Sequence, residues 1–370
     1  MKLRFQKDAI VNGINIVMKA VPSKTTMSIL ECILIDASTN EIKLTGNDME
    51  LGIETRVEGD ILEHGKIALD AKLFSEITRR LSSENASVTI ESDDKFNTTI
   101  SCENSVFNIQ GRDGEEFAYL PYIEKDKYIC LSQFTLKEVI QQTIFSISPN
   151  DSNKMMAGEL FEVNENQLKV VSLDGHRMSI RKIELKDHYN DIKVIVPGKT
   201  LGEISKILNG DNESEVQIFF SSNHIMFEFD STLVVSRLIE GEYFRISQML
   251  SSDYETKVNV NRRAFLDSIE RASILIREND KKPIIITITD EGMQLKMNSA
   301  YGTMNAEVGI TKFGKDIMIG FNPKFLIDAL RIIDDEEVTL YMMNPKSPCF
   351  IKDDEENYIY LILPVNFNAA

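Results

Sequence analysis

The sequence predicts an α+β protein made of three tandem domains of similar structure. Three observations predict it: a strand-then-helix unit occurs three times, a second such unit follows in each copy, and a further strand closes each copy. The copies are spaced by about 125 residues, which is the size of a whole domain and too long for a solenoid repeat. Loop-rich stretches place the expected domain boundaries so that the domains span 1–127, 128–251 and 252–370.

The first unit of each copy reads KLRFQKDAIVNGINIVMKAV, YICLSQFTLKEVIQQTIFSI and TKVNVNRRAFLDSIERASIL. Apolar residues recur at spacings of three and four after each strand, which predicts helices over 7–20, 133–147 and 262–277. One strand position and one helix position are apolar in all three copies, as expected for a shared core. These residues are Phe5, Leu131 and Val260 in the strands, and Ile14, Ile140 and Ile269 in the helices.

The second unit reads IALDAKLFSEITRRL, VIVPGKTLGEISKIL and IGFNPKFLIDALRII, which predicts helices over 71–81, 198–208 and 323–333. Its shared strand position carries Leu69, Val196 and Phe321. The closing strands begin at Val88, Val216 and Val338, and they alternate apolar and polar residues. Two helices against short antiparallel strands give each domain a layered α+β architecture.

Composition restricts the class of protein. The apolar fraction of 42% is ordinary for a folded chain of 370 residues. No apolar run approaches the roughly 18 residues that span a bilayer, and the N-terminus lacks the apolar core of a signal peptide. The four cysteines are scattered, which favours a reducing cytoplasm over a disulfide framework or a zinc site. We therefore expect a cytoplasmic protein with no membrane partner.

Charge is distributed unevenly along the chain. The six predicted helices hold twice as many basic as acidic residues, whereas the whole chain has 41 basic and 58 acidic residues and a net charge of −17. Lysine and arginine are good helix formers, so a plain solvated helix face is one interpretation. Glutamate forms helices equally well and is scarce in them, which favours a basic surface that holds a polyanion by its phosphates without reading bases.

No constellation of catalytic residues is evident. The four histidines are far apart, no phosphate-binding glycine motif is present, and the acidic pairs fall in turns beside strands. We expect no metal, no cofactor and no catalytic site. Two local features remain: the string Ser172–Met178, whose Asp-Gly pair predicts a hairpin turn, and the apolar tail 358–367, which predicts a last core strand.

Six strings in order resemble the bacterial sliding clamps, the beta subunits of DNA polymerase III: FQKDAIVNGINIVMKAVPSKTT, LTGNDMELGIE, SLDGHRMSIRK, VIVPGKTLGEISKIL, SRLIEGEYF and YLILPV. The resemblance covers the whole chain. It implies the DNA-clamp fold, in which two three-domain chains join head to tail in a ring. Such a homodimer encircles duplex DNA without sequence preference, is associated with the nucleoid, and is a processivity factor rather than an enzyme. The implied partners are the replicative polymerase subunit, the clamp loader and other proteins that carry a clamp-binding peptide motif.

The resemblance also implies site residues. A pocket for partner peptides, with a polar rim at His176 and Arg177, would comprise Met156, Leu173, Gly175, His176, Arg177, Met178, Phe244, Met249, Pro348, Leu361, Leu363, Pro364 and Val365. The duplex would contact Lys24, Asn150 and Lys199, and the charge distribution adds Lys72, Arg79, Arg80, Lys137 and Lys206. The joint between the two chains would involve Phe107, Ile109, Ile274 and Leu275.

Two alternatives remain open. A diverged clamp paralogue would serve as a non-replicative peptide-binding scaffold, and the residue at 244, phenylalanine where the family commonly has proline, fits divergence of the pocket. A DNA-acting enzyme with an inconspicuous site would need clustered carboxylates to hold a metal, and the sequence offers none at a plausible place.

Overall fold

The computed structural model describes residues 1–81, 86–148, 153–250, 253–277 and 282–367. Within these ranges the chain is α+β, with antiparallel pairing between strands and six α-helices at the six predicted places. The helices are α1 (Lys7–Val17), α2 (Ala71–Arg79), α3 (Gln133–Thr143), α4 (Gly198–Ile207), α5 (Arg262–Ser273) and α6 (Pro323–Ile332). All six helices end before their predicted last residue, and three of them do so by three or four residues: α1 and α3 tighten into a 3₁₀ turn over their last predicted residues, and α5 ends at Ser273.

The triple repeat is confirmed by burial. The apolar residues at the equivalent strand and helix positions of all three copies are buried, including Phe5, Leu131 and Val260 in the first strand of each copy. The closing strands predicted at Val88, Val216 and Val338 are present and pair with those first strands. None of the helices in the described residues is long and apolar enough to cross a membrane.

The chain folds into two compact units, and each is described by itself. The first comprises residues 1–136 and 202–238. Its strands are β1 (Lys2–Gln6), β2 (Cys32–Asp36), β3 (Ile42–Asn47), β4 (Leu51–Val57), β5 (Asp60–Glu63), β6 (Lys66–Asp70), β7 (Ser87–Ser92), β8 (Asn97–Cys102), β9 (Ser105–Gln110), β10 (Arg112–Asp113), β11 (Tyr128–Ser132), β14 (Glu215–Phe220), β15 (His224–Phe229) and β16 (Thr232–Arg237). They form a five-stranded sheet, β5-β1-β7-β8-β9, and a nine-stranded sheet, β10-β6-β2-β3-β4-β16-β15-β14-β11.

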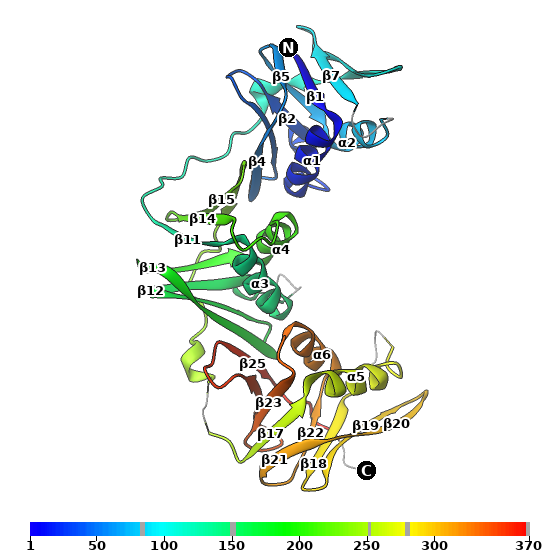
Figure 1. Ribbon diagram of the computed structural model, residues 1–370, viewed down its shortest axis with the longest axis vertical. Coiled ribbons are helices and arrows are strands. Elements are labelled where there is room, and N and C mark those ends of the chain that lie inside the picture. The colour runs from blue at the N-terminus through cyan, green and yellow to red at the C-terminus, as the bar shows by residue number, and fades with distance from the viewer. Residues whose placement is uncertain (82–85, 149–152, 251–252, 278–281, 368–370) are drawn as a thin grey trace. The chain divides into compact units, whose positions relative to one another are not determined.

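The second unit comprises residues 137–201 and 239–370. Its strands are β12 (Gly158–Leu173), β13 (Arg177–Pro197), β17 (Thr256–Asn261), β18 (Ile284–Thr289), β19 (Gly292–Ser299), β20 (Gly302–Val308), β21 (Ile310–Gly314), β22 (Ile317–Phe321), β23 (Glu337–Met342), β24 (Cys349–Lys352) and β25 (Tyr358–Ile362). They form a seven-stranded sheet, β12-β13-β25-β24-β23-β17-β21, and a four-stranded sheet, β20-β19-β18-β22. In Figure 1, α5 and α6 lie side by side in this unit, as α1 and α2 do in the first.

The middle third of the chain shares its strands between the two units. Strand β16 pairs with β4, so β11 and β14–β16 continue the sheet of the first third. Strand β13 pairs with β25, so β12 and β13 continue the sheet of the last third. Sheets that continue across a domain boundary satisfy backbone groups that edge strands would otherwise leave unpaired.

Short polar caps explain where three of the helices begin. The side chains of Asp70, Asn261 and Asn322 each accept a hydrogen bond from a backbone N–H in the first turn of α2, α5 and α6. Pro323 follows Asn322 at the first position of α6, where its missing N–H costs nothing. Each cap stabilises its helix by about 1 kcal/mol, and each is either the last residue of a strand or the residue after it, so the strand-to-helix turn is encoded locally.

Candidate partner site and charged surfaces

The hairpin predicted from Asp174-Gly175 is present between β12 and β13. The Asp174 carboxylate accepts hydrogen bonds from the backbone N–H groups of His176, at 2.9 Å, and Arg177, at 3.0 Å. Gly175 has φ = +85°, a conformation that strains other residues. The turn is therefore fixed by its own side chain and by the one residue type suited to that backbone.

Arg177 is buried and its guanidinium is fully engaged. The side chain is 8% exposed. Its Nε donates to Asp174 Oδ2 at 3.1 Å and one terminal nitrogen donates to Asp328 Oδ2 at 2.6 Å, while the other donates to the carbonyl oxygen of Phe145. The guanidinium also lies over the rings of Phe145 and Phe325, with its carbon 5.3 and 4.5 Å from their centroids.

That engagement changes the role expected for Arg177. The family resemblance implies a place for this side chain at a polar rim, but each of its three nitrogens already donates to an acceptor inside the protein. A donor that is satisfied and covered has little left to offer a ligand. Arg177 therefore braces the turn against α6, whereas His176 is exposed and stacks on Phe325 at a centroid distance of 6.2 Å.

Apolar residues of the predicted peptide pocket lie in contact in the structure although they are far apart in the sequence; we call them the apolar wall. Leu173, Met178 and Leu361 are buried in one hydrophobic cluster. Met156, Phe244 and Leu363 are half-buried and pack against it, so their exposed parts border the same cluster. Methionine and leucine side chains of this kind adapt to varied apolar partners.

The C-terminal tail runs alongside the hairpin. Strand β25 pairs with β13, so that Ile362 lies opposite Arg177 and Leu361 opposite Met178. The tail therefore forms an inner strand of the sheet, as predicted. Beyond the strand, Leu363 N–H donates to the His176 carbonyl at 2.9 Å, and Val365 N–H donates to the carbonyl of Gly320 at 2.8 Å.

The remaining predicted pocket residues lie near the ends of elements. Pro348, Pro364 and Val365 are half-buried, Pro348 just before β24 and the other two just after β25. Met249 is 43% exposed at the end of a 3₁₀ turn. The structure adds Phe325 and Asp328, which sequence reasoning missed because apolar and acidic positions of an amphipathic helix give no sign of which distant turn they contact.

The predicted DNA-contacting residues lie mainly on exposed positions. Lys72, Arg79 and Arg80 are exposed on α2 or at its end, and Arg79 donates to the Asn15 side chain of α1. The others are distributed as follows: Lys24 exposed in a loop, Lys137 half-buried on α3, Lys199 exposed on α4, and Lys206 exposed on α4 in an ion pair with Glu203. Asn150 lies outside the described residues.

The residues predicted at the joint between chains are apolar and accessible. Phe107 is 38% exposed and Ile109 half-buried on β9, the edge strand of the five-stranded sheet. Ile274, which caps the C-terminus of α5, is 80% exposed, and Leu275 beside it is half-buried. An apolar edge strand and an apolar helix end in water favour association with another chain.

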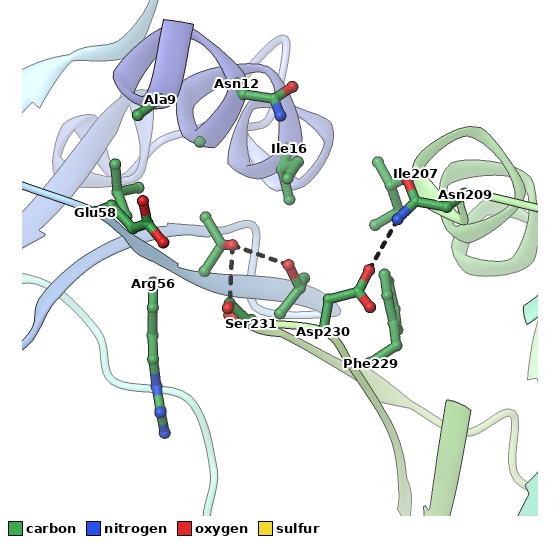
Figure 2. A pocket seen from close by; sticks show the side chains of 14 residues that line it. Ala9, Asn12, Ile16, Arg56, Glu58, Ile207, Asn209, Phe229, Asp230 and Ser231 are labelled. Atoms are coloured by element: carbon green, nitrogen blue, oxygen red, sulfur yellow. Dashed lines mark hydrogen bonds between the residues drawn. The ribbon is translucent and has the colours of Figure 1, made fainter. Parts of the chain in front are cut away.

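A groove of about 270 Å³ separates α1 from the end of α4 over the joint between β4 and β16. In Figure 2, several of the polar residues that line the groove are hydrogen-bonded to one another. The hydroxyls of Thr55 and Thr232 are 2.9 Å apart, and the Asp230 carboxylate accepts from Asn209 at 3.0 Å and from Gln133 at 3.1 Å. These contacts stabilise the pairing of β4 with β16 within the nine-stranded sheet. Among the described residues, no three His, Cys, Asp or Glu side chains are grouped to hold a metal ion.

Comparison with known proteins identifies the family. Models of the DNA polymerase III beta subunit match residues 1–121 with the N-terminal domain, 130–244 with the central domain and 247–366 with the C-terminal domain. The chain belongs to this family. The beta sliding clamp of Staphylococcus epidermidis is 33% identical over 376 residues, covering 99% of both chains.

Solved structures of clamps match over the full length. A structure from Eubacterium rectale assigned as a DNA polymerase III beta subunit is 65% identical, with a TM-score of 0.97 and coverage of 100% of both chains. The DNA polymerase sliding clamp of Bacillus subtilis is 31% identical, with a TM-score of 0.95 and the same coverage. The three-domain clamp fold expected from the six strings is thereby confirmed.

Proposed function

We propose that the protein is a replicative sliding clamp: two copies close head to tail into a ring around duplex DNA and tether the polymerase to its template. The observation that carries this proposal is that all three thirds of the chain match clamp domains over their full length. The same match favours the clamp over the non-replicative scaffold and over an enzyme. A tethered polymerase has a high effective concentration at the template, so an accessory subunit raises processivity without chemistry of its own.

The exposed apolar residues support the ring joint. A head-to-tail dimer would bury Phe107 and Ile109 of one chain against Ile274 and Leu275 of the other, twice per ring. Strands β9 and β20 are edge strands, each of a different sheet, so their outer backbone groups are available to pair between chains. Closure then removes both edges and the apolar surface from water.

The basic helix residues support contact with DNA phosphates. Exposed lysine and arginine contacts are individually weak and screened by salt, and phosphates carry no sequence information. A ring held by such contacts stays on the duplex by topology and slides along it. We expect the protein in the cytoplasm, associated with the nucleoid.

The apolar cluster beside the hairpin supports a peptide site for the polymerase, the clamp loader and other clamp-binding proteins. A peptide that buries two large apolar side chains there gains roughly 1.5–3 kcal/mol from each, so a few further contacts give micromolar affinity. His176 would supply the polar rim, and the residues around Met156 and Leu363 the adaptable wall.

Retention on DNA tests the proposal. After loading with a clamp loader and ATP, we expect the protein to stay on nicked circular DNA, to leave the same DNA once it is linearised, and to stay on linear DNA whose ends are blocked by bound streptavidin. Gel filtration separates the retained protein from the free protein. Equal retention on circular and open linear DNA contradicts sliding. Binding of a clamp-motif peptide without retention on any DNA favours the scaffold.

A further inference from the structure

Helix α6 contacts the hairpin turn through two residues on one face. Phe325 and Asp328 are separated by three positions, so both side chains point to the same side of the helix. Phe325 lies under the His176 ring and under the Arg177 guanidinium. Asp328, whose side chain is 21% exposed, holds the same guanidinium by an ion pair at 2.6 Å.

The position of Arg177 determines the position of the turn and of the tail. Its backbone pairs with Ile362, and the neighbouring His176 carbonyl accepts from Leu363 N–H. Its side chain is fixed by two carboxylates, a carbonyl and two aromatic rings. A planar guanidinium with this many directed contacts has one arrangement that satisfies them all. The contacts of α6 with Arg177 therefore also fix the positions of His176 and of the apolar residues beside it.

We propose that Asp328 is a positioning residue for peptide binding, which acts through Arg177 and does not itself touch the peptide. This inference rests on the peptide site proposed above. By anchoring the buried guanidinium, Asp328 sets the spacing between the His176 rim and the wall formed by Leu173, Met178 and Leu361. Without it, a charge that is only 8% exposed loses one of its two anionic partners. The turn then shifts to bring the guanidinium to water, and the site loses its preformed shape.

The test measures the affinity of a fluorescein-labelled Gln-Leu-Ser-Leu-Phe peptide for the full-length protein by fluorescence anisotropy. We expect Asp328→Ala to weaken binding about tenfold or more, because a charged hydrogen-bond partner is lost. Asp328→Asn keeps an acceptor without the charge and should weaken binding by a smaller factor. If Asp328 acts through Arg177, Arg177→Ala combined with Asp328→Ala should bind no more weakly than Arg177→Ala alone.

Two controls separate positioning from general destabilisation. Arg331→Ala removes another ion pair of the same helix, with Glu270 at 2.7 Å, and should leave peptide affinity unchanged. Ile269→Val removes a buried methylene from α5 and should lower the melting temperature without changing affinity.

Three results overturn the inference. The first is wild-type affinity in Asp328→Ala, and the second is full additivity of the two alanine substitutions. The third is an affinity loss in Ile269→Val that equals the loss in Asp328→Ala at the same drop in melting temperature. Failure of the wild-type protein to bind the peptide at all removes the proposed peptide site and this inference with it, whereas the first three results leave the peptide site standing.

Discussion

Charged side chains are usually exposed and large apolar side chains are usually buried. The hairpin turn at Arg177 and the end of helix α5 each break one half of this rule. At the turn a cation is buried, and at the helix end Ile274 is 80% exposed. The cation is neutralised within its own unit by Asp174 and Asp328. The apolar helix end has no comparable cover in the described part of its unit. Buried polar groups here maintain the geometry of one chain, whereas the exposed apolar groups lie where we propose that a second chain binds.

The largest effect that we expect is loss of association between chains when the exposed apolar side chains at the end of α5 are removed. Ile274→Ala with Leu275→Ala deletes two large side chains from each proposed joint, at about 1.5–3 kcal/mol for each side chain. Because a ring has two joints, we expect the double variant to be monomeric at micromolar concentration. Sedimentation velocity measures the change.

A matched control lies in the same unit. Phe313 is 57% exposed on β21, an edge strand outside the proposed joint, so Phe313→Ala should remain dimeric. A double variant that stays fully dimeric would place the joint elsewhere and remove the contrast between the two regions.

Glu159 is a second buried polar group, and unlike Arg177 it has no partner of opposite charge within hydrogen-bond distance among the described residues. Glu159 on β12 is fully buried; one carboxyl oxygen accepts from the Thr143 hydroxyl at 3.0 Å, and the other has no hydrogen-bond partner among the residues that the structure describes. Burial raises the pKa of this carboxyl from 4.5 to about 8. The folded state therefore holds a proton that the unfolded state releases above pH 4.5, and stability falls as the pH rises from about 4.5 to 8.

Glu159→Gln should abolish that loss, because the amide is neutral at every pH and keeps an acceptor for Thr143. Relative to wild type, we expect the variant to be more stable by about 2–5 kcal/mol at pH 8.5 and to differ much less at pH 4.5. Urea unfolding at the two pH values measures the difference. Glu184→Gln, at an exposed position of the neighbouring strand β13, should show no such pH-dependent gain. Equal pH dependence in wild type and Glu159→Gln would mean that the carboxyl is ionised in the fold.

The sequence predicts the parts of the molecule whose signals are local. Helix periodicity and the Asp-Gly turn are each contained in a few neighbouring residues, and all six helices and the hairpin lie where predicted. The proposed pocket and joint residues came from the family resemblance, and five of the proposed DNA contacts came from the distribution of charge among the helices. Local pattern gives no information on links such as Arg177 to Asp328, because the two residues are 151 positions apart. The continuation of sheets from one third into the next was missed for the same reason.

The smallest effect that we expect is on DNA affinity, from the removal of an exposed lysine. Lys72 is exposed on α2, and nothing buries it as Arg177 is buried. A phosphate contact from such a side chain contributes no more than about 1 kcal/mol and is screened by salt. Lys72→Ala should therefore reduce DNA affinity less than about fivefold at low salt and lower the salt dependence by about one ion. Lys95→Ala changes another exposed lysine, in the turn between β7 and β8, and should alter neither quantity. If Lys72→Ala abolishes DNA binding, this exposed lysine contributes far more than about 1 kcal/mol to the affinity. The expectation that exposed cations make weaker contacts than buried ones would then be wrong.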